Sequence, residues 1–119
     1  MEDTLYRDKL LDHYYSPRNY GLRDGFNIEA KGENPLCGDS ITMRLKIADQ
    51  KITDVCFEHE GCVISRAAAS LLSEYIKGKA QNEIESLSPE HMLNLLGVAI
   101  MPARLKCALL ALEAIKIVL

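Results

Sequence analysis

Polar and apolar residues alternate in two neighbouring runs in the middle of the chain, and this is the period of a half-buried strand. The first run, residues 40–48, has its apolar positions at Ile41, Met43, Leu45 and Ile47. The second run, residues 52–59, carries Val55 and Phe57 on one face, and Asp49-Gln50 between the runs is typical of a hairpin turn. We therefore predict an antiparallel pair, with a short third strand near Phe26 and Ile28 in the otherwise turn-rich segment 22–39.

Other parts of the chain have a helical period. Apolar residues recur at three- and four-residue spacing over segments 4–15, 62–77, 89–97 and 102–119. Ser88 followed by Pro89 is a helix-start signal, and Gly78 and Gly97 are stop signals. The sequence thus predicts an α+β fold, in which a small antiparallel three-stranded sheet has its helices packed mainly on one face.

Composition narrows the class of protein. The 119 residues, 48% of them hydrophobic, suit one domain over residues 1–119. The net charge of -3 and the lack of a basic cluster argue against nucleic acid as a partner. The sequence shows neither an apolar run of membrane-spanning length nor a secretory start, so we expect no membrane association and a cytoplasmic location.

Cysteine is the residue type with candidate chemistry. In a chain without an export signal thiols stay reduced, which favours metal or thiol chemistry over disulfides. The spacing of Cys37, Cys56, Cys62 and Cys107 contains no C-x-x-C pair and suits ordinary buried cysteines as well as a metal site. Cys62 and Cys107 fall near predicted helix starts, where the helix dipole favours thiolate over thiol.

The segment NPLCGDS, residues 34–40, places the Cys37 thiol and the Asp39 carboxylate two positions apart around Gly38. Such a loop can present both groups to one metal ion. The alternative is a turn in which Asp39 caps a nearby N–H and Cys37 is simply packed.

Four separated segments decide between these alternatives. They are YRDKLLDHYYSPRNYG (6–21), NPLCGD (34–39), FEHEGCVISRAAASLLSEYIKGK (57–79) and PARLKCALLALEAI (102–115). In this order and spacing, the chain resembles the iron-sulfur cluster assembly scaffold family of IscU, SufU and the N-terminal domain of NifU.

The resemblance implies a site and a function. Its candidate ligands are Cys37, Asp39, Cys62 and Cys107, which would hold a transient [2Fe-2S] cluster or, alternatively, Zn²⁺. The implied partners are a cysteine desulfurase, which supplies sulfur as persulfide, and the apo iron-sulfur proteins or carrier proteins that receive the cluster. The implied role is that of a scaffold rather than an enzyme, acting as a monomer or weak homo-oligomer.

The subtype stays open. IscU-type members have histidine where this chain has Lys106, and PARLKC is similar to SufU-type members. However, the 45 positions from Cys62 to Cys107 leave no room for the usual SufU insertion. Likeness to IscU-type members suggests Cys107 as the sulfur acceptor, and likeness to SufU-type members suggests Cys37.

Three other interpretations compete with a scaffold. One is a zinc-bound persulfide acceptor that activates a desulfurase, as in SufU. A second is a structural zinc module. The third is a cysteine-nucleophile enzyme, for which His59 is the histidine nearest a cysteine in sequence. Cys56, on the strand face with Asp54 and Glu58, is interpreted as structural.

Overall fold

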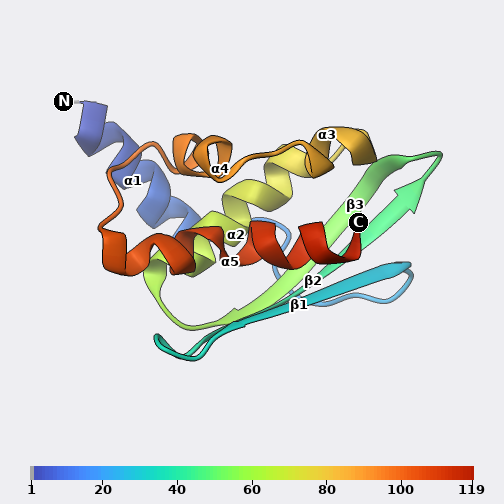
Figure 1. Cartoon of the computed structure of the whole chain (residues 1–119), viewed down its shortest axis with the longest axis horizontal. Coiled ribbons are helices and arrows are strands. Elements are labelled where there is room, and N and C mark those ends of the chain that lie inside the picture. The colour runs from blue at the N-terminus through green and yellow to red at the C-terminus, as the bar shows by residue number, and fades with distance from the viewer. Residues whose placement is uncertain (1) are drawn as a thin grey trace.

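The computed structural model describes residues 2–119, with side chains from residue 7 onward. The strands come early in the chain and the helices dominate its second half, as Figure 1 shows. In chain order the elements are α1 (Glu2–Tyr15), β1 (Ile28–Asn34), β2 (Asp39–Ala48), β3 (Lys51–Glu60), α2 (Val63–Ile76), α3 (Gln81–Glu85), α4 (Pro89–Leu96), the 3₁₀ turn η1 (Pro102–Arg104) and α5 (Leu105–Val118).

The strands form one antiparallel sheet in the order β1-β2-β3, which confirms the predicted three-stranded sheet. The first strand lies later than expected. It covers Ile28–Asn34, so Ile28 lies in the strand as predicted and Phe26 does not, and it pairs with β2 down to Asn34 opposite Asp39. Only Ala30 and Asn34 are buried in this strand, so its sequence lacks the apolar alternation that revealed the other two.

All of the predicted helices are present, and most of their ends follow the expected capping residues. The Ser88 hydroxyl accepts a hydrogen bond from the His91 backbone N–H at 3.2 Å, Pro89 opens α4, and Gly97 ends it with a φ of 71°. A short helix, α3, lies between α2 and α4 and was not predicted. Within residues 2–119 no helix has both the length and the apolar character needed to cross a membrane.

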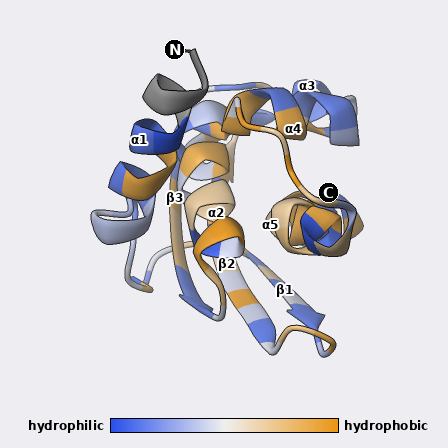
Figure 2. Ribbon diagram, turned by 90° about the vertical axis from the view of Figure 1, so that its left-hand side faces the viewer, coloured by the Kyte–Doolittle hydropathy of each residue, from blue (hydrophilic) through white to orange (hydrophobic). Residues whose placement is uncertain are grey.

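The helices cover one face of the sheet in two layers (Figures 1 and 2). Helices α2 and α5 lie directly on the strands, α1 packs against α2, and α4 packs against both α2 and α5. The core fills the space between them. Its largest fully buried side chains are Phe57, Met43, Leu45, Ile52, Leu72, Ile76, Ile84, Met92, Leu96, Leu112, Ile115 and Val55.

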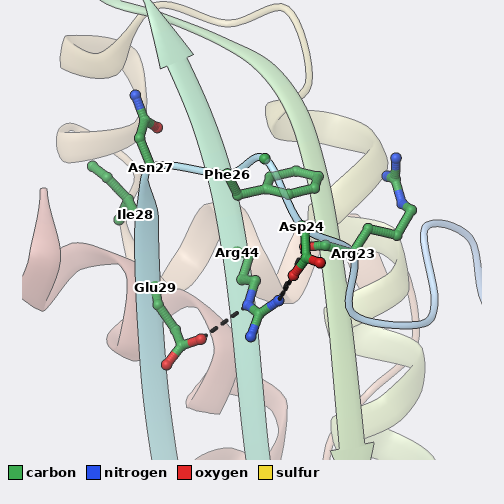
Figure 3. A pocket seen from close by; sticks show the side chains of 8 residues that line it. Arg23, Asp24, Phe26, Asn27, Ile28, Glu29 and Arg44 are labelled. Atoms are coloured by element: carbon green, nitrogen blue, oxygen red, sulfur yellow. Dashed lines mark hydrogen bonds and ion pairs between the residues drawn. The ribbon is translucent and has the colours of Figure 1, made fainter.

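The segment between α1 and β1 covers part of the opposite face of the sheet. Backbone hydrogen bonds join Asn19 and Gly21 to Phe57 on β3, and the chain then crosses over β2, where Arg44 donates to the Arg23 carbonyl at 3.0 Å. Figure 3 shows the pocket of about 310 Å³ that this crossing forms.

Cys56 is fully buried, consistent with a structural role.

Gly32 on β1 allows the sheet and α5 to approach closely. A Cβ at this position would lie 3.1 Å from Leu110 Cδ1 and 3.2 Å from Ala114 Cβ. Contacts this short leave no space for a larger side chain without moving the helix. The packing of α5 on β1 matters for function because α5 carries Cys107.

Replacing Gly32 by valine is therefore expected to destabilise the protein by about 1–3 kcal/mol, the usual cost of overpacking a core. Urea unfolding measures this change. Lys31→Val is the matched control, because it adds the same side chain at the neighbouring, solvent-exposed position of the same strand. Equal stability of the two variants would show that α5 is not closely packed at Gly32.

Candidate metal centre

Three junctions of the chain meet at one end of the molecule, on the left in Figure 1. The first is the β1–β2 hairpin, whose four-residue loop holds Cys37 and whose second strand begins at Asp39. The second is the turn from β3 into α2, where Cys62 is the N-cap residue. The third is the start of α5, where Cys107 is the third residue.

The structure brings together the predicted site residues from these junctions. The ligand atoms of Cys37, Asp39 and Cys107 all lie within 4.8 Å of one another. Cys62 adjoins this group, with its Sγ 3.8 Å from Asp39 Oδ2. Cys37 is exposed and Cys62 half-buried, whereas Asp39 and Cys107 are buried, so the group opens to solvent on the side of the hairpin loop.

Asp39 links the hairpin to the start of α2. Its Oδ1 accepts a hydrogen bond from the Cys62 backbone N–H at 2.8 Å. Gly61 makes this approach possible, since it has a φ of +135° and a Cβ there would lie 2.8 Å from Asp39 Cα. The glycine before Cys62 is thus required by the position of the aspartate.

The charge state of the site differs from what helix position alone predicts. Burial raises the pKa of the Asp39 carboxyl, but hydrogen bonds from Cys107, the Cys62 backbone and Ser65 outweigh it, so the net pKa is lowered. Burial, and then hydrogen bonding with Asp39, Cys37 and Cys62, raises the pKa of Cys107. The expectation that the helix start favours a Cys107 thiolate is therefore wrong for the metal-free protein, because neighbouring acidic groups and burial outweigh the helix dipole.

Sequence reasoning missed the polar side chains that support this group. Asn34 Nδ2 donates to Cys107 Sγ at 3.6 Å, and the Ser65 hydroxyl oxygen lies 3.5 Å from Cys62 Sγ. His59, the histidine nearest a cysteine in sequence, hydrogen-bonds to Ser65 and is 6% exposed. The position of Ser65, three residues after an N-cap, is the one signal in the sequence that pointed to a contact with Cys62.

Arg104 is the cation that faces the thiols. The nearby thiols, Cys107 first and then Cys62 and Cys37, raise the pKa of the Arg104 guanidinium. Lys106 is exposed on α5, close in sequence to Cys107. The end of η1 thus brings a positive charge close to the three cysteines.

Together these features define a class: a small α+β protein in which three thiols and one carboxylate, the donor types of thiolate-rich metal sites, converge at the end of an antiparallel sheet. The chain belongs to the NifU-like N terminal domain family, whose model matches residues 5–119.

Several characterised proteins are similar to this chain. The zinc-dependent sulfurtransferase SufU of Bacillus subtilis is 38% identical, over 96% of this chain and 88% of the relative. The iron-sulfur cluster assembly scaffold protein IscU of Escherichia coli is 34% identical, over 93% of this chain and 88% of the relative. A crystal structure described as a SUF-system scaffold protein, from Fervidobacterium islandicum, matches with a TM-score of 0.82 at 27% identity, covering 97% of this chain and 96% of that one.

The unequal burial of the cysteines predicts the order in which they react. In the metal-free protein, iodoacetamide is expected to modify the exposed Cys37 first and Cys107 at least about tenfold more slowly, because a raised pKa lowers the thiolate fraction tenfold per unit. Mass spectrometry of peptides at successive times measures the order, and unfolded protein serves as the control in which both sites react. Equal rates of modification of Cys37 and Cys107 in the folded protein would contradict their unequal burial.

The contact between Gly61 and Asp39 predicts the effect of a single methyl group. Gly61→Ala is expected to weaken Zn²⁺ binding by about tenfold or more, because it displaces Asp39 from the site. Gly78→Ala is the control: Gly78 has a φ of +88° but open space around it, so alanine there has a conformational cost of about 1–2 kcal/mol without a clash. Competition with a chelator measures the affinity, and equal affinities would show that Gly61 does not position Asp39.

Proposed function

We propose that this chain is a scaffold for iron-sulfur cluster assembly. It receives sulfur from a cysteine desulfurase, holds a transient [2Fe-2S] cluster on Cys37, Asp39, Cys62 and Cys107, and passes the cluster to apo-proteins or carrier proteins. The observation that carries the proposal is the convergence of these four side chains from three separate junctions of the chain. Membership of the family and the named roles of the relatives support it.

The donor set fits its proposed cargo. Thiolate sulfur is a soft ligand that suits both iron-sulfur clusters and Zn²⁺. The carboxylate of Asp39 is a harder ligand than the thiolates, which suits a centre that must later be released. Buried Cys107 and Asp39 form the inner part of the site, and exposed Cys37 leaves one side accessible to a partner protein.

Exposure favours Cys37 over Cys107 as the first sulfur acceptor. In persulfide transfer the acceptor thiolate attacks the terminal sulfur of the donor persulfide; a new S–S bond forms on the acceptor and the donor cysteine leaves as a thiolate. The acceptor must therefore reach the partner protein. Cys37 lies on an exposed loop, whereas Cys107 is 0% exposed.

A second function has its own support. The Bacillus subtilis relative is named a zinc-dependent sulfurtransferase. The segment PARLKC of this chain also resembles SufU-type members. In that function the same four side chains would hold Zn²⁺, and the chain would relay persulfide sulfur. The aligned region spans 132 positions with that relative, more than this chain has residues, and 116 with Escherichia coli IscU. In length the chain is therefore closer to Escherichia coli IscU than to Bacillus subtilis SufU.

The remaining features of the proposal come from the sequence. We propose that residues 1–119 act as one scaffold domain in the cytoplasm, as a monomer or weak homo-oligomer, with proteins rather than nucleic acid or membranes as partners. The chain would work by binding rather than by catalysis. Several of its arginines form ion pairs with acidic side chains, among them Arg23 with Asp54 and Arg44 with Glu29.

Anaerobic reconstitution with iron and sulfide tests the proposed function. The wild-type protein is expected to show the visible absorption of a bound cluster, and Cys37→Ala is expected to lose it because one thiolate ligand is missing. Cys56→Ala is the matched control and should keep the cluster, since Cys56 is buried elsewhere.

Two other results would change the conclusion. Zinc that is retained through reconstitution, together with faster turnover of a cysteine desulfurase, would favour the sulfurtransferase function. A protein that binds neither a cluster nor zinc would contradict both functions.

A further inference from the structure

A pair of buried polar side chains lies directly behind the proposed ligands. Ser65 Oγ is 2.5 Å from His59 Nε2, 3.5 Å from Cys62 Sγ and 3.2 Å from the Cys62 carbonyl oxygen. Ser65 is 1% exposed and His59 is 6% exposed. Polar groups buried to this extent need hydrogen-bond partners, and here those partners include a candidate metal ligand.

The pair links the end of β3 to the start of α2, on either side of Cys62. His59 is the next-to-last residue of β3 and Ser65 the third residue of α2, so their contact spans the turn at Gly61. The Ser65 backbone N–H also points to Cys62 Sγ, at 3.5 Å. The sulfur of Cys62 is therefore held at the start of α2 by both polar groups of one serine.

The direction of these hydrogen bonds matters, because a hydroxyl has a single hydrogen to donate. Burial, and then the charge of Arg66, lowers the pKa of His59, so its ring is neutral near pH 7 and carries one N–H. With that hydrogen on Nε2, His59 donates to Ser65 Oγ, and the Ser65 hydrogen is left for Cys62. Its two acceptors there are the carbonyl oxygen at 3.2 Å, which already accepts from the Arg66 backbone N–H, and Sγ at 3.5 Å. With the hydrogen on Nδ1, Ser65 would donate to His59 instead.

We propose that His59 and Ser65 are positioning residues of the metal site: His59 Nε2–H holds the Ser65 hydroxyl against Cys62, so that the hydroxyl hydrogen is directed to the Cys62 sulfur. This inference rests on the proposed function, since it concerns how the same four ligands are held. It extends that function to two residues that do not themselves bind the metal.

The negative charge of the four ligands explains why hydrogen-bond donors such as Ser65 would be needed at the site. Three thiolates and a carboxylate exceed the charge of one divalent ion, and the excess lies in a partly buried site. Hydrogen bonds to ligand atoms disperse this negative charge and fix the orientation of each ligand. The Cys62 backbone N–H already donates to Asp39, and Asn34 Nδ2 donates to Cys107, so Ser65 completes a set of donors around the ligands.

A second histidine–serine pair offers a control of the same chemistry. His13 Nδ1 is 2.6 Å from Ser70 Oγ, and both residues are buried. This pair joins α1 to α2 and lies two turns along α2 from Cys62. Breaking it removes a buried hydrogen bond without touching the ligands.

The test uses the full chain, freed of metal and loaded with Co²⁺, because the sulfur-to-cobalt charge-transfer band reports on the thiolate ligands directly. Ser65→Ala and His59→Phe are expected to shift this band to lower energy and to speed metal loss to a chelator by about tenfold. His59→Gln is expected to behave like the wild type, since its side-chain N–H can take the place of Nε2–H. Ser70→Ala should leave the band and the rate unchanged.

The effects of the two substitutions on metal loss are expected not to add. The double variant Ser65→Ala with His59→Phe should lose metal no faster than Ser65→Ala alone, because both substitutions break the same chain of hydrogen bonds, from His59 through Ser65 to Cys62. If Ser65→Ala does not fold, the comparison of His59→Phe with His59→Gln decides the question by itself.

The possible failures can be told apart. A wild-type protein that gives no sulfur-to-cobalt band contradicts the proposed function itself. A wild-type protein that gives the band, together with Ser65→Ala and His59→Phe variants that match Ser70→Ala, overturns the positioning role and leaves the function intact. Equal loss of metal from His59→Gln and His59→Phe also overturns it, because the donated hydrogen would then be irrelevant.

Discussion

The hydrogen bond from the Cys62 backbone N–H to the Asp39 carboxylate, at 2.8 Å, joins the parts of the chain on which the site depends. It ties the start of β2 to the N-terminus of α2, where free N–H groups and the helix dipole favour a negative charge. Asp39 is 2% exposed, so its carboxylate must have such partners. Gly61 accommodates it, and Cys37 is held beside it by the same hairpin.

Around this bond the protein gathers one carboxylate and three thiols, and two of them, Asp39 and Cys107, affect each other's ionisation in opposite directions. With Asp39 charged, the Cys107 thiol beside it keeps its proton and serves as a hydrogen-bond donor. A divalent metal or an iron-sulfur cluster would reverse this balance, because its positive charge stabilises the thiolates. In the proposed function the acidic groups of the site thus suit a cationic cargo, and Arg104 offsets part of their negative charge.

Much of the fold could be predicted from residue patterns. Alternation revealed β2 and β3, and Ser88, Pro89 and Gly97 marked both ends of α4. The first strand was placed too early because Glu29, Lys31 and Glu33 point to solvent and, after Ile28, its inward positions are small or polar. An edge strand buried on one side by Ala30, Gly32 and Asn34 carries no apolar signal, and only the helix packed on it explains those residues.

The sequence by itself determined that Cys37 and Asp39 share a turn, because two positions separate them, and that Cys62 and Cys107 stand at helix starts. The resemblance of four segments to a family indicated that all four side chains belong to one site. Only the tertiary structure decided how they meet, which of them are buried, and that Ser65 and His59 lie behind Cys62. The physical reason is that burial and hydrogen-bond direction depend on the packing of β2, β3, α2 and α5, whereas spacing along the chain describes only neighbours.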